Sequence, residues 1–333
     1  AFIESTLAQI WKVRGENGEF RGGPAYYIQQ ALHSRALGVV FAISLLLCFG
    51  LGFNGLQTYN MSSSLQAYIP NYTQTAAPMA LGILLAVVFA FIIFGGTRLI
   101  SYMTSVIVPT MAGGYILLTI ILSIMNIGEL PGIFATIVTE AFDFSSVVGG
   151  FAGSMVVQGI KRGLFSNEAG MGSAPNAAAS ASVSHPVKQG LVQTFSVFID
   201  TIIICSCSAV MIMFFVNDNV DLIAWGGATG EAALTNMTLV QAAMQNGFGA
   251  AGLHFMTLAI FFFAFSSLIG NYFYAEGNFK YITGSKPALY IFRILCCIVI
   301  FFGAQSNLTL AWNLADIFMG IQATINIIVI LIL

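Results

Sequence analysis

The segment Phe165-Ser-Asn-Glu-Ala-Gly-Met-Gly-Ser-Ala-Pro175 carries the strongest fold signal in this chain, because it interrupts a long apolar stretch with poor helix formers. Ser, Asn and Gly destabilise the interior of a helix. Ser173 as an N-cap, with Pro175 in the following turn, is typical of a helix start. The stretch from Phe144 to Ser184 is therefore predicted to be a helix that stops, unwinds and begins again. The alternative is a glycine-rich cytoplasmic loop followed by a surface helix.

The composition of the chain places it in a lipid bilayer. Of its 333 residues, 58% are hydrophobic and 7% are charged, whereas roughly a quarter of the residues of a soluble domain are charged. A membrane-spanning helix needs about 20 mostly apolar residues. Besides the interrupted stretch, the apolar runs are Ala1–Val13, Ala36–Asn60, Met79–Gly96, Leu99–Met125, Leu191–Val216, Ala251–Ala275, Ala288–Gln305 and Leu308–Leu333. The first run is short and opens without Met, so we expect an N-terminal portion to precede it.

Basic residues are sorted between alternate connections. One set of connections contains Lys12, Arg14, Arg21, Arg35, Arg98, Lys188, Lys280, Lys286 and Arg293. The other set contains Glu129, Glu140, Asp143, Asp218, Asp221 and Glu231, and no Lys or Arg. The positive-inside rule places the basic connections, including 14–35, in the cytoplasm of a protein of the cell membrane. No basic run is long enough to follow a phosphate backbone, so no nucleic-acid partner is expected.

An unwound segment at membrane depth has a specific meaning. Its free N–H and C=O groups are not tolerated in hydrocarbon, so the segment must line a cavity or be packed in protein. Half-helix ends there direct their dipoles at a ligand: N-termini favour a carboxylate, and C-terminal carbonyls favour a cation. Such a break suits a site for a zwitterion together with a metal cation.

The order of the runs suggests two inverted repeats, each opening with a broken helix, as in many secondary transporters. We expect residues 1–125 to be the remainder of the first repeat, 126–143 an extracellular loop, and 144–333 the second repeat. On this interpretation the first repeat lacks its opening core helix, and Ala1–Val13 is part of its second.

Motifs spread along the chain resemble the alanine/glycine:cation symporter family, whose members are of the amino acid–polyamine–organocation type with the leucine-transporter fold. The motifs are Phe2-Ile-Glu-Ser-Thr-Leu-Ala8, Gly22-Gly-Pro-Ala-Tyr-Tyr-Ile28, Phe49-Gly-Leu-Gly-Phe-Asn54, Arg162 to Pro175, His185-Pro-Val-Lys-Gln-Gly190, Phe198-Ile-Asp-Thr-Ile202, Phe263-Ala-Phe-Ser-Ser267 and Ala315-Asp-Ile317. The block Ser166-Asn-Glu-Ala-Gly170 is long and unusual, which makes the resemblance specific.

The resemblance implies an all-α integral membrane protein with five-plus-five inverted repeats and broken helices. It implies symport of alanine or glycine, coupled to sodium or to protons, by alternating access. Sodium would be a co-transported ion, and the protein would act as a monomer in the bilayer. The family's glycine-rich first core helix is absent from this chain. Asn271 also departs from the family pattern, where an aromatic residue is common, and this leaves open a symporter or exchanger of the same fold for another small zwitterion.

Candidate substrate-binding residues lie at the predicted break and on one earlier run. At the break they are Ser166, Asn167, Glu168, Gly170, Met171 and Gly172, where glycine lets a ligand approach the backbone closely. Gly150 and Phe151, within Gly149–Gly153, mark a rival break, for which tight helix packing is the alternative. Asn54 and Gln57 face the same way on a helix and could bind an amino acid or bond between helices.

Adjacent hydroxyls on the Ala251–Ala275 run resemble the sodium site of this fold. Ser266 and Ser267, with the backbone of Ala264, are the sodium candidates. Sodium prefers hard oxygen ligands, and hydroxyls and carbonyls supply them without adding charge. The alternative is that both hydroxyls bond back to carbonyls of their own helix.

Three charged residues within membrane segments are candidates for gating or proton transfer, since such residues are expensive there. Asp200 and Asp316 lie inside apolar runs, and Arg162 lies before the break. If Phe165–Pro175 is the break, Arg162 lies deep in the protein and needs an acidic partner, for which Glu168 and Asp316 are the candidates. A membrane enzyme or an ion channel is disfavoured, because the sequence has no catalytic cluster or repeated filter motif.

Overall fold

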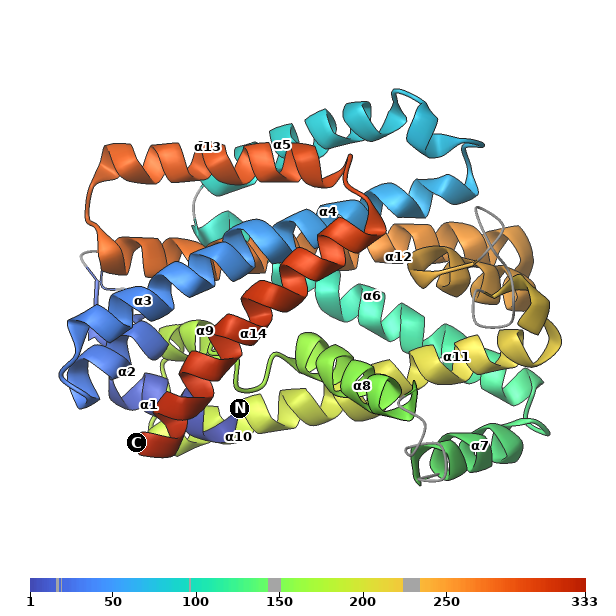
Figure 1. The fold of residues 1–333 in the computed structure, drawn as a ribbon, viewed down its shortest axis with the longest axis horizontal. Coiled ribbons are helices and arrows are strands. Elements are labelled where there is room, and N and C mark those ends of the chain that lie inside the picture. Colours follow the sequence, from blue (N-terminus) through green and yellow to red (C-terminus); the bar gives the residue numbers. More distant parts are fainter. Residues whose placement is uncertain (16–17, 19, 96, 143–150, 224–233) are drawn as a thin grey trace.

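A computed structural model describes residues 1–333 except 16–17, 19, 96, 143–150 and 224–233. The side chains of 97–104, 140–142 and 151–156 also lie outside the described part. The described residues fold into helices, together with a two-stranded antiparallel hairpin near the N-terminus (Figure 1).

The first part of the chain contains one short helical stub and three long apolar segments. Its elements are α1 (Phe2–Ile10), β1 (Val13–Arg14), β2 (Phe20–Arg21), α2 (Pro24–Ala31), α3 (Arg35–Leu45), the π-helix η1 (Leu46–Phe53), α4 (Asn54–Ser63), the 3₁₀ turns η2 (Ser64–Ala67) and η3 (Tyr72–Gln74), α5 (Ala77–Gly95), α6 (Thr97–Met125) and α7 (Leu130–Phe142). The basic connection 14–35 is thus not a simple loop, because it contains β2 and α2.

The second part begins at the interrupted stretch. Its elements are α8 (Phe151–Asn167), α9 (Ala174–Ser180), α10 (Pro186–Phe198), the π-helix η5 (Ile199–Ile204), α11 (Cys205–Asp218), the 3₁₀ turn η6 (Val220–Leu222), α12 (Asn236–Ile282), α13 (Lys286–Gly303) and α14 (Leu308–Ile332). Gly249 is non-helical, with a φ of 62°, and divides α12 into two helices.

Among the described residues, seven helical segments are long and apolar enough to cross a membrane. Their boundaries follow local capping chemistry. Ser34 accepts a hydrogen bond from the Leu37 amide (3.3 Å), and Asn307 accepts one from Leu310 (2.9 Å), as N-caps do. Large apolar side chains cover the outside: Phe91 is 74% exposed and Leu331 is 81% exposed. Water would penalise this surface, whereas lipid solvates it.

Two pairs of helices in the molecule pack in antiparallel fashion. The segment α3–α4 packs along α12, with Gly38 against the hydroxyl of Tyr281 at one end and Ser64 bonded to Gln241 at the other. Likewise α5 packs along α13, and the rings of Phe94 and Tyr290 stack 6.0 Å apart. In Figure 1, α14 crosses α3–α4 obliquely, and α8 lies on the other side of α14 from α13.

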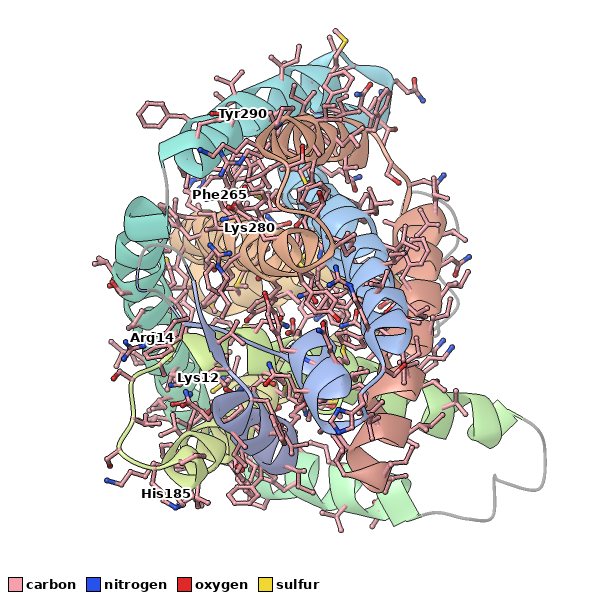
Figure 2. The ribbon with its side chains drawn as sticks, turned by 90° about the vertical axis from the view of Figure 1, so that its left-hand side faces the viewer. Lys12, Arg14, His185, Phe265, Lys280 and Tyr290 are labelled. Atoms are coloured by element: carbon pink, nitrogen blue, oxygen red, sulfur yellow. The ribbon has the colours of Figure 1, made fainter. Side chains whose placement is uncertain are left out.

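Basic side chains gather at one end of these helices. Lys12, Arg14 and Lys280 lie on the face shown in Figure 2, where α3 begins and α12 ends. At the opposite end in Figure 1 lie α7, which follows Glu129, and the end of α11, whose last residue is Asp218. The sorting of charge in the sequence is therefore also a sorting in space.

Candidate functional site

The helix is interrupted within the glycine-rich segment. α8 ends at Asn167 and α9 begins at Ala174. Between them Glu168, Gly170 and Gly172 have φ values of 53°, 82° and 82°, which is the left-handed region that favours glycine. At Gly172 a Cβ atom would also lie 2.6 Å from Pro24 Cγ and 2.8 Å from Phe41 Cζ, so only glycine fits. We call residues 168–173 the break.

Glu4 of α1 occupies the concave side of the break. Its side chain is fully buried. The amide of Gly170 donates to Glu4 Oε1 (3.0 Å), and the amide of Gly172 donates to Glu4 Oε2 (3.2 Å). Asn326 Nδ2 of α14 adds a third donor at 3.1 Å. Backbone amides that converge on one anion in this way form a nest, so the break has the chemistry of a carboxylate site and holds one from its own chain.

The carbonyl groups of the break are also bonded to side chains. Asn326 donates to the carbonyl of Gly170 (2.9 Å), Gln322 to that of Met171 (2.8 Å) and Asn176 to that of Gly172 (2.8 Å). The sequence interpretation assigned these backbone groups to a ligand. In this conformation they are satisfied by the protein itself, which is what burial of an unwound backbone requires.

Tyr27 extends this network to α2. Burial, and then the nearby Glu4 carboxylate, raise the pKa of the Tyr27 hydroxyl well above its usual value, so it remains protonated. It donates to Asn326 Oδ1 at 2.5 Å. Asn326 thus joins three different elements, α1, α2 and the break, from its place on α14.

Asn176 makes the equivalent connection to α12. It lies in the first turn of α9, and its Oδ1 accepts a hydrogen bond from Asn278 at 2.8 Å. A Cβ atom at Gly23 would collide with the same oxygen. The restarted helix is therefore held from both sides, by α12 and by the turn that precedes α2.

The polar residues around the start of the break point toward the π-helix η5. Ser166 donates to Asp200 Oδ2 (2.6 Å), and Asn167 Nδ2 donates to Thr201 Oγ1 (3.2 Å). Glu168 instead accepts from Ser173 across the break at 2.5 Å. Ser166 and Asn167 therefore join the end of α8 to Asp200 and Thr201 of η5, and π-helical turns often mark functional sites.

Arg162 is paired with Asp316 and not with Glu168. Its Nη2 atom lies 2.7 and 2.6 Å from the two oxygens of Asp316. Its guanidinium carbon stacks 4.0 Å above the ring of Trp312, which in turn contacts Phe165 at 5.1 Å. These contacts join α8 to α14 just before the break. We call the four residues Arg162, Phe165, Trp312 and Asp316 the strut.

The structure separates the remaining candidates from the break. Asn54 is fully buried, and its Oδ1 has no hydrogen-bond partner among the described residues. Gln57 lies half-buried one turn further along α4. The π-helix η1, which leads into α4, reaches α8 through the Phe53–Phe165 ring contact, with ring centroids 4.8 Å apart. Gly150 lies outside the described residues, and of Phe151 only its place at the start of α8 is described.

The sodium candidates lie on the part of α12 after Gly249. Ser266 and Ser267 both donate to the carbonyl of Phe263, at 2.8 and 3.0 Å, which is the alternative role considered for them. Their lone pairs remain compatible with a cation. Ala264 packs in an apolar cluster with Met61 and Phe89. No hydrogen bond among the described residues links this pair to the break.

The sequence interpretation missed several residues that hold the break. They are Glu4, Tyr27, Asn176, Gln322 and Asn326. A signal existed for three of them. Gln322 and Asn326 are amides four residues apart inside an apolar run, and so share one helix face. Glu4 is a carboxylate inside the first apolar run, and an ionisable residue in such a run is a candidate functional residue.

Comparisons with known proteins identify the family. A sequence model of the sodium:alanine symporter family matches residues 1–333. The amino-acid carrier protein AlsT of Bacillus subtilis (strain 168) is 47% identical over all of this chain and 68% of its own length. The probable sodium/glutamine symporter GlnT of the same organism is 42% identical, and the sodium/alanine symporter AgcS of Methanococcus maripaludis is 35% identical. Each alignment covers all of this chain, and respectively 66% and 71% of the relative.

The chain thus spans about two thirds of the length of these relatives. The family model matches the chain from residue 1 to residue 333. Its helices supply the apolar spans that a multi-pass membrane transporter needs. The chain belongs to the sodium:alanine symporter family.

Proposed function

We propose that the protein is a secondary active transporter that carries a small neutral amino acid, such as alanine or glycine, together with sodium by alternating access. The family and the names of relatives such as the sodium/alanine symporter AgcS support this activity. Sodium is then a co-transported ion and not a resident cofactor. The observation that carries the proposal is the break, an unwound membrane segment whose amides bind a carboxylate.

An inverted repeat is supported by how corresponding helices pack. In each half a long span, Arg35–Ala67 or the part of α12 after Gly249, is followed by two further spans. The corresponding members contact each other across the halves: α1 with α10, α4 with α12, and α5 with α13. The last two pairs are antiparallel. A two-fold axis in the membrane plane produces such self-complementary pairs, so 1–125 and 144–333 are proposed as the two repeats.

The break would take part in substrate binding only after a change of partners. Glu4 holds the amides of Gly170 and Gly172 in the described conformation. For these amides to bind a substrate carboxylate, α1 must withdraw Glu4 from the nest. The site role of Ser166 to Gly172 therefore predicts that α1 moves relative to α8 and α9 during transport, as alternating access requires.

The sidedness follows from charge. The basic end seen in Figure 2 would face the cytoplasm under the positive-inside rule, with residues 14–35 inside and 126–143 outside the cell. The cell membrane is the proposed location.

The test is uptake by the full-length protein in proteoliposomes. We expect labelled alanine to accumulate under an inward sodium gradient and to equilibrate without one. Unlabelled glycine and glutamine serve as competitors, because one relative is named for glutamine. Uptake that responds to neither a sodium nor a proton gradient would overturn the proposal. Competition by glutamine and not by glycine would correct the substrate.

A further inference from the structure

An apolar groove lies on the outside of the molecule, between α13 and α14. Its volume is about 240 Å³. Its floor consists of Leu51 and Gly52 of η1 with Gly55 and Leu56 of α4, and its walls are the last turns of α13 and the first turns of α14. In Figure 1 these two helices diverge from the turn that joins them, with α4 between them. The groove is therefore the space that two diverging helices leave over a third.

Glycines bring both helices onto the floor and leave the middle of the groove empty. A Cβ atom at Gly303 of α13 would lie 2.8 Å from the Gly55 carbonyl oxygen, and one at Gly52 would lie 3.1 Å from Phe318 Cδ2 of α14. Both helices thus pack closely on the η1–α4 backbone, as small residues allow in membranes. A Cβ atom at Gly55 itself would meet nothing within 4 Å. The floor between the two close contacts is therefore not covered by the protein.

The groove is apolar and open to the hydrocarbon of the bilayer. Ser306 is the one polar residue among the described residues that line it. All the others belong to segments that are long and apolar enough to cross a membrane, so hydrocarbon surrounds them. On the rim, Phe302 is 63% exposed and Leu310 is 51% exposed. Water gains almost no hydrogen bonds in such a groove, and a zwitterionic solute finds no partner there for either charge.

The size of the groove distinguishes a lipid chain from a further helix. A helix with its side chains is about 10 Å across, so the volume of the groove equals only about two residues of one. A single acyl chain is flexible and much narrower, and each of its methylene groups gains from burial against apolar side chains. The groove therefore fits one chain of a lipid, and not a membrane span of this protein or of a second copy.

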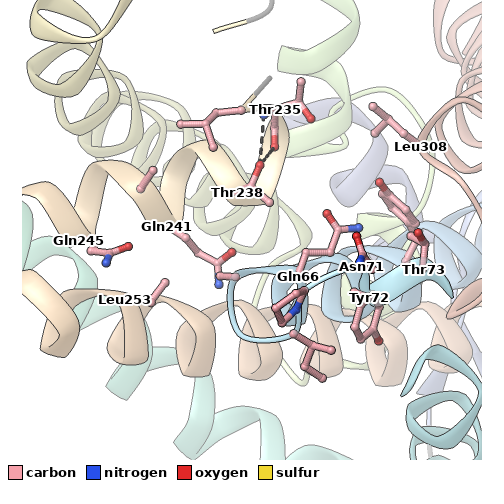
Figure 3. Close-up of a pocket in the computed structure, with 16 residues that line it drawn as sticks. Gln66, Asn71, Tyr72, Thr73, Thr235, Thr238, Gln241, Gln245, Leu253 and Leu308 are labelled. Atoms are coloured by element: carbon pink, nitrogen blue, oxygen red, sulfur yellow. Dashed lines mark hydrogen bonds between the residues drawn. The ribbon is translucent and has the colours of Figure 1, made fainter. Parts of the chain in front are cut away.

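The groove ends where the surroundings change from hydrocarbon to water. Next to it lies the cavity of about 570 Å³ drawn in Figure 3, which has exposed amides such as Gln66 and Asn71 in its lining. Leu308 lines that polar cavity, whereas Leu310 lines the groove. Ser306, at the same end of α14, is therefore at the boundary of the membrane. Its uncharged hydroxyl suits the ester groups of a lipid, which lie at this depth.

We propose that the groove binds one acyl chain of a phospholipid of the outer leaflet, with the ester groups of the lipid at Ser306. The bound chain fills the space between α13 and α14 and so fixes the start of α14 on η1 and α4. Because α14 also carries Gln322 and Asn326, which hold the break, the lipid supports the helix on which the break depends. The site goes beyond the proposed transport function, from which it takes only the orientation that makes this end the outer one.

The experiment is photo-cross-linking of the full-length protein in nanodiscs that contain phosphatidylcholine with a diazirine in one acyl chain. Peptide mass spectrometry compares the labelling of residues 298–314 with that of α5 around Phe91, which is 74% exposed. Gly55→Leu fills the groove from its floor, and Gly320→Leu, at an exposed glycine of α14 outside the groove with the same open space, is the matched control. We expect enriched labelling in the wild type and the control. In Gly55→Leu it should fall about tenfold, as when about two methylene groups lose their contacts.

Wild-type labelling no stronger in the groove than around Phe91, including a groove that other protein covers, would overturn the proposal, as would equal labelling of the wild type and Gly55→Leu. If Gly55→Leu does not fold, Leu310→Trp fills the groove from its exposed rim and decides the question, with Leu331→Trp at the far end of α14 as its control. Sodium-driven uptake is measured in parallel. Absent uptake with enriched labelling would reject the transport function and keep the site, and normal uptake without enriched labelling would do the reverse.

Discussion

At the scale of single residues, the break is stable because buried side chains replace the missing helical hydrogen bonds. Glu4, Gln322, Asn326 and Asn176 satisfy the amides and carbonyls between Gly170 and Gly172. Each partner comes from an element distant in sequence or from the restarted helix. A substitution here should therefore affect the packing of several helices at once.

We predict that Glu4→Gln weakens the fold around the break. The variant keeps one acceptor oxygen but places an NH₂ group against an amide donor, and hydrogen bonds to a charged group contribute about 1.5–3 kcal/mol. Thermal unfolding of the purified full-length protein should move to lower temperature, and the initial rate of alanine uptake should fall. Glu129→Gln, at an exposed loop position, is the control. Equal stability of the two variants would show that Glu4 does not hold the break.

Gly172→Ala should be more harmful than an ordinary glycine substitution. The left-handed φ of 82° and the close atoms of Pro24 and Phe41 both oppose a Cβ atom. Overpacking alone destabilises by about 1–3 kcal/mol, and the left-handed backbone adds roughly 1 kcal/mol. Gly163→Ala, on α8 with open space around its Cα, should be tolerated. Thermal stability of both variants checks this, and a well-folded Gly172→Ala protein would contradict it.

At the scale of elements, the strut between α8 and α14 fixes the helix that leads into the break. Arg162 and Asp316 are 35% and 19% exposed, so the pair is only partly shielded. Removal of one partner should then be milder than the 3–5 kcal/mol typical of a fully buried pair, and we expect about 1–2 kcal/mol.

The double-variant cycle of Arg162→Gln and Asp316→Asn measures this coupling. Each single variant leaves one charge without its partner, and the double variant leaves none. We expect the double variant to retain more uptake and more thermal stability than the two single effects combined predict. Additive losses would mean that the two residues act separately and that their pairing does not couple α8 to α14.

The antiparallel packing of α5 on α13 can be tested by cross-linking. Phe94 and Tyr290 are stacked and partly exposed. In a background without the native cysteines, Phe94→Cys with Tyr290→Cys should be joined by a short bifunctional thiol reagent. Phe94→Cys with Tyr68→Cys, at the other end of the helices, should not be joined. The reverse pattern would exclude the proposed relation between the two halves.

The sequence predicted the apolar spans well, because a run of about 20 mostly apolar residues is suited to lipid and not to water. It also predicted that Phe165–Pro175 interrupts a helix, since glycine at positive φ leaves a local signature. It did not predict the π-helices at Leu46–Phe53 and Ile199–Ile204, whose apolar residues satisfy either helical period. Nor did it predict that Glu4 and Asn326 hold the break, because nothing local in the sequence specifies a contact across more than 150 residues. Asp316 was predicted as one of two candidate partners of Arg162, because few carboxylates lie inside apolar runs.

At the scale of the whole molecule, α4 packs on α12 and α5 on α13, and the break lies where α1, α2, α12 and α14 converge. The family prediction is confirmed by the match over residues 1–333. The sodium roles of Ser266, Ser267 and Ala264, the substrate role of the break and the division into two repeats stay predictions. Together they describe a protein in which release of Glu4 from the break accompanies the change of access.

The central claim is that movement of the amino acid and of sodium is coupled. The most direct measurement is alanine-driven entry of ²²Na⁺ into proteoliposomes that contain the full-length protein, with no initial sodium gradient. The account predicts that an inward alanine gradient drives ²²Na⁺ above its equilibrium level, and that protein-free liposomes show no such rise. Alanine entry with ²²Na⁺ remaining at equilibrium would contradict it.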